Sequence, residues 1–417
     1  MSTPTIKLDK LCDLVSVQVK PADMPDAPYL GLEHLEPGRL LPTGFGGSDE
    51  VGSHKSVFKP GDVLYGKLRP YLDKAVLADR EGIATTELLV LRPKPWVTPE
   101  YLVCVLHSPT FIDFAMQGVT GAQHPRTSWG HVRNFELPDW GVRIQESIAG
   151  LLWSLYRLRM ATEAAIESAS GLKRSAMRQL FSRGLRGEAQ KDTRIGPIPA
   201  SWEASRLDAV ADVISTRMSY AELLRAQPST GANAIRVLGI KVSDMNALGN
   251  EVEISQSALD VMVDRDVAEL RCAPPGAIIF PKRGAAIATN KKRIARTWTV
   301  FDPNVIGVVA HEGLHQRLLF HWFQAFDLRT ITEPGPTPQL NKKNLVPLLV
   351  PVPPAVEEQQ EIVEVLDALD HKIALHRRKR EVIDQLFRSL LHKLMIGEMA
   401  VDGLDLCALP KLEGSAA

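Results

Sequence analysis

The stretch "EIVEVLDALDHKIALHRRKREVIDQLFRSLLHKL", residues 361–394, carries an apolar residue at alternating steps of four and three. That spacing puts one narrow apolar stripe along an α-helix, as in coiled coils. The stripe consists of Ile362, Leu366, Leu369, Ile373, Ile383, Phe387, Leu390 and Leu394, and it is interrupted by His376 and Arg380. The pattern predicts a long helix over residues 355–399 whose apolar seam packs against another helix.

A looser stripe of the same kind lies near the middle of the chain. It consists of Ile148, Leu152, Leu155, Leu158, Ile166, Leu172 and Leu180 and predicts a helix over residues 142–186. Basic residues crowd the end of this helix (Lys173, Arg174, Arg178, Arg183, Arg186), and acidic residues crowd the start of the later one (Glu357, Glu358, Glu361, Glu364, Asp367, Asp370). Antiparallel pairing of the helices brings these charges together. The alternative is that each helix packs only on its own neighbouring domain.

Outside the two helices, the chain contains an internal repeat with a period near 214 residues. "GDVLYGKLRP" (61–70) resembles "GAIIFPKRGA" (276–285), and "KLCDLVSV" (10–17) resembles "RLDAVADV" (206–213). "VRNFELPDW" (132–140) and "LVPLLVPVPP" (345–354) each directly precede a long helical pattern. The order is therefore globular, helix, globular, helix.

Each copy of the repeat combines short β-rich runs, Gly and Pro turns and a few short helices. We therefore expect an α+β fold with two similar mixed α/β domains, each followed by a long helix, and the helices pairing as an antiparallel coiled coil with pseudo-twofold symmetry. The expected boundaries are domain 1 at 1–141, a helix at 142–186, a linker at 187–205, domain 2 at 206–354, a helix at 355–399 and a tail at 400–417.

Composition limits the range of functions. The 417 residues include 49 basic and 49 acidic ones, so any binding of nucleic acid must come from local patches. Four isolated cysteines indicate a reducing compartment. The polar start and the short, proline-broken apolar runs favour neither a signal peptide nor a membrane span, so a cytoplasmic location without membrane contact is expected.

Three segments together resemble the specificity subunit of type I restriction-modification systems over essentially the whole chain. They are "GDVLYGKLRPYLDKAVLADREGIATTELLVLRP" (61–93), "IGPIPASWEASRLDAVADV" (195–213) and "VPPAVEEQQEIVEVLDALDHKI" (352–373). The resemblance implies two target recognition domains separated by spacer helices. It further implies a non-catalytic reader of double-stranded DNA that recruits two methyltransferase subunits and restriction/translocase subunits. No cofactor is then expected in this chain, because S-adenosylmethionine, ATP and Mg²⁺ belong to the partner subunits.

Two recognition domains with different sequences predict two different half-sites, hence a bipartite, asymmetric target. Between residues 273 and 300 there are six basic residues and no acidic one, a composition suited to phosphates. "GAQHPRTSWGH" (121–131) and its counterpart "TPQLNKKN" (337–344) carry polar side chains that can reach base edges. The candidates for DNA contact are Lys67, Arg69, Lys74, Gln123, Arg126 and Ser128 in the first copy and Lys282, Arg283, Lys291, Lys292, Arg293, Gln339, Asn341 and Lys342 in the second. The alternative for each is an ordinary solvated surface residue.

A zinc-hydrolase motif is also present, since "HEGLHQRLLFH" (311–321) contains His311, Glu312 and His315 in His-Glu-x-x-His order. In such enzymes the motif lies inside a helix, whereas the β-branched run before His311 predicts a strand that ends there. A zinc metallohydrolase is therefore the weaker alternative, and a stand-alone DNA-binding scaffold is another. No nucleotide-binding or methyltransferase motif is found, so no metal or catalytic residue is expected in this chain.

Overall fold

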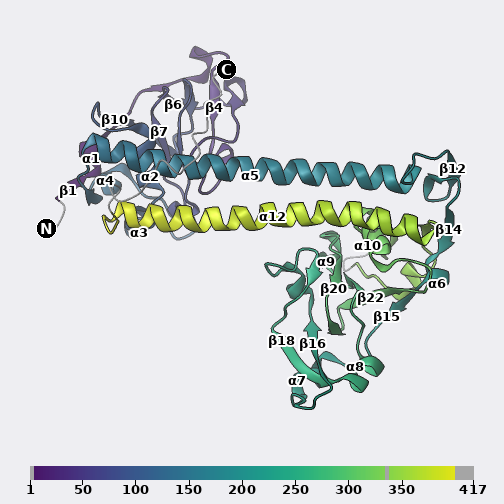
Figure 1. Cartoon of the computed structure of the whole chain (residues 1–417). Coiled ribbons are helices and arrows are strands. Elements are labelled where there is room, and N and C mark those ends of the chain that lie inside the picture. Colours follow the sequence, from purple (N-terminus) through teal and green to yellow (C-terminus); the bar gives the residue numbers. More distant parts are fainter. Residues whose placement is uncertain (1–3, 334–337, 400–417) are drawn as a thin grey trace. The chain divides into compact units, whose positions relative to one another are not determined.

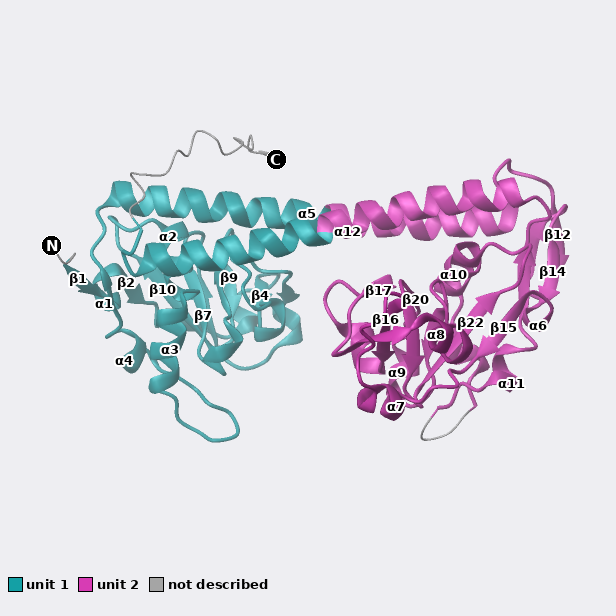
Figure 2. Ribbon diagram, turned by 60° about the horizontal axis from the view of Figure 1, so that its bottom comes forward, with its two compact units in different colours: residues 1–164, 377–417 teal, residues 165–376 magenta. Residues whose placement is uncertain are grey.

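The computed structural model describes residues 4–333 and 338–399, which divide into two compact units (Figure 2). Unit 1 comprises residues 1–164 and 377–417, and unit 2 comprises residues 165–376. The expected tail at 400–417 lies outside the described residues. No helix in the described ranges combines the length and the apolar character needed to cross a membrane.

Unit 1 is a mixed α/β body built on two antiparallel-rich sheets (Figure 1). One sheet has the order β2-β10-β7-β8, the other β3-β6-β9-β4-β5, and β1 pairs with β11. The strands are β1 (Thr5–Lys7), β2 (Cys12–Leu14), β3 (Gln18–Val19), β4 (Pro28–Leu30), β5 (Gly46–Gly47), β6 (Lys55–Phe58), β7 (Val63–Gly66), β8 (Ala75–Leu77), β9 (Gly82–Ala84), β10 (Leu88–Pro93) and β11 (Glu136–Pro138). The helices are α1 (Leu8–Leu11), α2 (Pro99–Leu106), α3 (Pro109–Gln117), α4 (Trp129–Val132) and the first part of α5 (Val142–Arg183).

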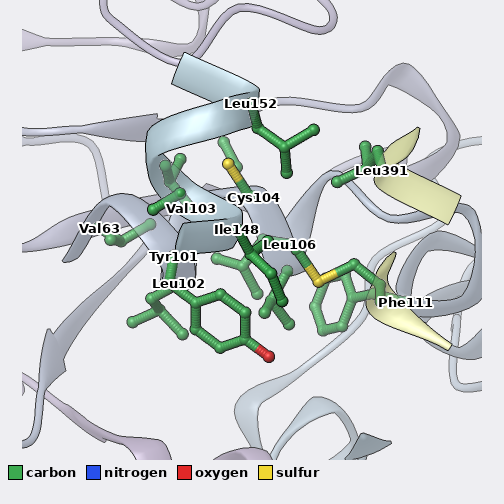
Figure 3. Close-up of a cluster of buried hydrophobic side chains, with 14 of the residues drawn as sticks. Val63, Tyr101, Leu102, Val103, Cys104, Leu106, Phe111, Ile148, Leu152 and Leu391 are labelled. Atoms are coloured by element: carbon green, nitrogen blue, oxygen red, sulfur yellow. The ribbon is translucent and has the colours of Figure 1, made fainter. Parts of the chain in front are cut away.

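The core of unit 1 joins the sheet to both long helices. Figure 3 shows Val63 of β7, Tyr101 and Leu102 of α2, Leu152 of α5 and Leu391 of α12 among its buried side chains. Helix α2 is uniformly apolar from Tyr101 to Leu106 because it is enclosed on all sides. Burial of this central helix anchors the long helices to the rest of unit 1.

Unit 2 repeats this architecture with an additional two-stranded pair, β12-β13. Its two larger sheets have the orders β15-β22-β19-β20-β17 and β18-β16-β21, and β14-β23 is a two-stranded pair like β1-β11. The strands are β12 (Gln190–Thr193), β13 (Gly196–Pro199), β14 (Glu203–Arg206), β15 (Ala211–Ile214), β16 (Ala234–Ile240), β17 (Glu253–Ile254), β18 (Leu259–Asp264), β19 (Ile278–Pro281), β20 (Arg293–Ala295), β21 (Trp298–Phe301), β22 (Val305–Ala310) and β23 (Leu349–Val352). The helices are α6 (Leu207–Val210), α7 (Tyr220–Arg225), α8 (Arg265–Arg271), α9 (Ala285–Ala288), α10 (Gln316–Ala325), α11 (Lys342–Leu345), the last part of α5 and the first part of α12 (Val356–Met395), whose last part belongs to unit 1.

A backbone hydrogen bond that occurs in both units shows which residues of unit 1 correspond to which residues of unit 2. Leu8 N donates to Phe135 O in unit 1, as Leu207 N donates to Leu348 O in unit 2. Lys7 therefore matches Arg206, and the sequence-based match of "KLCDLVSV" with "RLDAVADV" is wrong by three residues. The error arose because a basic residue followed by Leu occurs twice here, at Lys7 and again at Lys10, and only the strand pairing separates them.

Helices α5 and α12 pack side by side in opposite directions within each unit. In unit 2, Lys173 Nζ lies 2.6 Å from Asp370 Oδ1, and twelve residues further on, Leu185 N donates to Glu358 Oε1 at 3.2 Å. In unit 1, Arg159 Nε lies 3.0 Å from Asp384 Oδ1. Of the opposite charges noted in the sequence, Lys173 and Asp370 therefore meet in unit 2.

The predicted seam residues are largely buried. Ile148, Leu152, Leu155, Ile362, Leu366, Ile373 and Phe387 are buried, and Leu369 is partly so. Leu172 is wrong as a seam residue, because 56% of it is exposed while its neighbour Lys173 is buried. Lys173 lies four residues after Ala169 and four before Met177, both of which are buried, so an apolar residue one position away faces solvent.

Candidate nucleic-acid interface

A loop of the same construction lies next to the main sheet in each unit. In unit 1, Thr127 N donates to Lys67 O at 3.0 Å and Arg69 N donates to Pro125 O at 2.7 Å, which places Arg126 opposite Leu68. Thr120 and Arg126 exchange two backbone hydrogen bonds, of 2.9 and 3.0 Å. Residues 67–69 and 120–127 thus form one small sheet, which we call the hairpin edge of unit 1.

Unit 2 contains counterparts of three of these four backbone hydrogen bonds. Leu340 N donates to Lys282 O and Gly284 N to Pro338 O, both at 2.9 Å, which places Gln339 opposite Arg283. Glu333 N donates to Gln339 O at 3.2 Å. Residues 282–284, 333 and 338–340 are therefore the hairpin edge of unit 2, in which Gln339 corresponds to Arg126.

The sign of φ supports this match, although ψ differs, at 67° for Arg69 and −158° for Gly284. Arg69 and Gly284 correspond, and both have positive φ, 52° and 69°. A short helix follows directly in each case, the 3₁₀ turn Pro70–Leu72 in unit 1 and α9 in unit 2. A left-handed conformation is rare for arginine and is held only where the surroundings enforce it. Arg69 therefore places a charged side chain at a position whose positive φ glycine adopts with less strain.

Most of the other sequence candidates lie on or beside these hairpin edges. Lys282 and Arg283 belong to the edge of unit 2, and Gln123 is exposed at the hairpin tip of unit 1. Ser128 and Asn341 occupy the N-caps of α4 and α11 at matching positions, and Lys342 follows in α11. Figure 2 shows the loop between α3 and α4 projecting from unit 1 on the side away from the long helices.

Two lysine candidates are directed onto the protein instead. Lys74 Nζ donates to Leu32 O at 2.7 Å. Lys292 is 4% exposed and its Nζ donates to Phe326 O at 2.5 Å. Neighbouring Lys291 hydrogen-bonds Asn246, and Arg293 donates to Met245 O at 2.9 Å. The prediction that Lys292 contacts DNA phosphates is therefore wrong, because its ammonium is buried against a carbonyl that lies 34 residues away in sequence.

Burial lowers the pKa of Lys292 to about 8, with Asp327 acting in the opposite direction. The unfolded chain keeps the ordinary higher pKa, so between pH 8 and 10.5 it binds a proton that the folded chain has released, and stability rises with pH. We expect Lys292→Met to stabilise the protein at pH 7. The difference in free energy of unfolding between this variant and the wild type should fall by about 3 kcal/mol between pH 7 and pH 10.5. Urea unfolding of both proteins across this range measures the effect, and a constant difference would contradict it.

The zinc-hydrolase motif is divided between two elements. His311 follows β22 with its Nε2 3.3 Å from an Asp212 carboxylate oxygen, whereas His315 is the N-cap of α10. His315 N donates to Gln359 Oε1 at 2.6 Å, as Thr98 N donates to Gln145 Oε1 at 3.3 Å in unit 1. His315 thus occupies the same capping position as a threonine in the other copy. Its hydrogen bond to Gln359 joins α10 to α12.

The described residues also contain one group of possible metal ligands, His321, Asp367 and Asp370, with ligand atoms within 4.8 Å of one another. Both carboxylates already have cationic partners. Asp367 lies 2.6 Å from Arg317 Nε and 2.8 Å from His321 Nε2, and Asp370 lies 2.6 Å from Lys173. The group is therefore an ion network that joins α10 to the long helices.

Residues 278–385 match the family model described as the type I restriction modification DNA specificity domain, a range that begins in β19 and includes the hairpin edge of unit 2. A putative type I restriction enzyme MjaX specificity subunit from Methanocaldococcus jannaschii is 26% identical over 82% of this chain and 79% of its own length. Residues 278–385 thus match the DNA specificity domain of type I restriction-modification systems, and most of the chain is similar to a specificity subunit of such a system.

Further proteins are similar to this chain in sequence or in fold. The EcoDI specificity subunit of Escherichia coli is 23% identical over 52% of this chain and 46% of its own length. The fold is similar to that of the type I S subunit from M. genitalium, with TM-score 0.59, 12% identity and coverage of 95% and 99%. A chain from a study of assembly and conformational transition of the type I R-M system gives TM-score 0.54, 18% identity and coverage of 96% and 100%. Specificity subunits are the non-catalytic members of their systems, and no finding supports the zinc-hydrolase alternative.

Proposed function

We propose that this chain is a specificity subunit that reads a bipartite, asymmetric target in double-stranded DNA, one half-site with each unit. The observation that carries the proposal is the hairpin edge. Its backbone hydrogen bonding recurs in both units, but each unit presents different side chains on it. A repeated backbone presenting different side chains is what two different half-sites require. Two methyltransferase subunits and restriction/translocase subunits, with their S-adenosylmethionine, ATP and Mg²⁺, complete the cytoplasmic complex.

The function is tested by co-expressing the chain with a type I DNA methyltransferase subunit from its source genome and mapping modified bases across the host genome. We expect one methylated motif made of two different half-sites with an unread gap. The same methyltransferase expressed without the chain serves as the control and should leave the motif unmodified. Absence of any motif with both subunits present would contradict the proposal. Failure of the two to co-purify would favour a stand-alone DNA-binding protein.

Phosphate binding at the hairpin edge gives a second prediction. Lys282→Ala with Arg283→Ala removes two cations of the unit 2 edge. If each neutralises one phosphate, the slope of log K against log salt becomes shallower by about 2. Lys292→Met removes a buried cation from the same basic region and should leave the slope unchanged. Binding of the purified chain to one duplex at several salt concentrations measures both slopes, and equal slopes for the two variants would contradict the assignment.

A further inference from the structure

Positions 126 and 339 have the most constrained backbones of the hairpin edges. Both backbone groups of Arg126 bond to Thr120, and the residues on either side bond to Lys67 and Arg69. Gln339 O accepts from Glu333, and its neighbours bond to Lys282 and Gly284. A side chain that starts from a fixed backbone can meet a ligand atom with a narrow range of geometries.

Strand alternation determines which way these side chains point. Thr127 is 3% exposed and Leu340 is 0% exposed, so each following residue faces the interior of its unit. Successive side chains of an extended segment lie on opposite faces, which directs Arg126 and Gln339 outward. Arg126 is 45% exposed.

A third segment completes the edge in unit 1. Lys67 N donates to Glu87 O at 3.0 Å, which places Glu87 beside the edge, and Glu87 Oε2 lies 3.1 Å from Arg126 Nε. A carboxylate on Nε holds the guanidinium plane, and the two terminal amino groups can still act as a bidentate fork. In unit 2 the matching backbone bond runs from Lys282 N to Asn304 O at 2.7 Å, so an amide replaces the acid.

The two outward side chains have different base preferences. Arginine makes bidentate contacts to guanine O6 and N7, and glutamine makes them to adenine N6 and N7. We propose that Arg126 reads a guanine in one half-site, that Gln339 reads an adenine in the other, and that Glu87 positions the Arg126 guanidinium. The inference rests on the proposed function and names the residues that set the bases.

The test uses the full chain and duplexes in which each base pair of the wild-type motif is changed singly. Arg126→Gln should convert one G·C preference of the first half-site to A·T and leave the second half-site unchanged. Gln339→Arg should convert one A·T preference of the second half-site to G·C and leave the first half-site unchanged. Each change should alter relative affinity at that base pair by about tenfold to a hundredfold. The unaltered half-site reports in each variant that the protein is folded.

Arg126→Lys keeps the charge but loses the fork, so it should relax the guanine preference without introducing adenine. Glu87→Gln should reduce the guanine preference severalfold at the same base pair, with melting temperature and all other preferences unchanged. An effect on stability alone would make Glu87 merely structural. If wild type selects a bipartite motif and neither exchange alters base preference, the inference fails while the proposed function stands. If wild type selects no motif, the proposed function itself fails.

Discussion

Asp370→Ala is expected to lower the free energy of unfolding of unit 2 by about 3–5 kcal/mol, the usual cost of leaving one partner of a buried ion pair alone. The Lys173 side chain is 9% exposed, and its ammonium also contacts Gln324. Burial lowers the pKa of Lys173, and Asp370 opposes that shift by favouring the charged form. Without the carboxylate, the buried ammonium has lost the partner that offsets its desolvation.

Unit 1 supplies the matched control. Gln145 and Gln359 correspond as the anchors of the two long helices, so Asp370 corresponds to Tyr156, and Lys173 corresponds to Phe387. Tyr156 and Phe387 are both buried in the apolar core of unit 1. Lys173→Phe combined with Asp370→Tyr should therefore restore stability to wild type or above, since apolar replacement of a whole buried pair is often neutral or stabilising.

Hydrogen exchange of the α10 backbone amides measures this effect, because it reports opening of unit 2 separately from unit 1. Asp370→Ala should reduce protection of α10, and the double variant should recover it. A loss below 1 kcal/mol for Asp370→Ala would show that water or Gln324 compensates the lysine.

Exchange of residues 207–348 for the matching segment of a relative with a different target is expected to replace one half-site completely. The segment starts directly after β14 and ends directly before β23, and its two ends are joined by the 2.7 Å bond from Leu207 N to Leu348 O. The Gln359 side chain holds the segment by His315 N and Gly313 O, which are backbone groups that any replacement also has. The segment is therefore a self-contained body, and its backbone provides the groups through which Gln359 holds it.

The original target should fall to the level of non-specific DNA, a loss on the order of 10³ or more. The half-site read by unit 1 should be retained, because its hairpin edge is untouched. Motif mapping of modified bases measures both halves at once. A change in both half-sites would show that the units do not read independently.

Local patterns in the sequence were sufficient for the long helices and for the repeat. A stripe that recurs every three or four residues depends only on neighbouring positions, and α5 and α12 were found from it. The strand before His311 was predicted from β-branched residues and is β22. The same local reasoning placed Leu172 one position off the seam, because a single Leu in a loose stripe cannot show which face is covered.

Only the tertiary structure decided which charged residues remain available for DNA. Lys292 belongs to a run of basic residues, yet Phe326 accepts its hydrogen bond from a distant part of the chain. The hairpin edge of unit 1 brings together Lys67, Glu87 and Arg126, which are far apart in sequence, through hydrogen bonds between separate strands. Helical periodicity is a local property of the chain, whereas the pairing of distant strands depends on contacts that no short stretch of sequence contains.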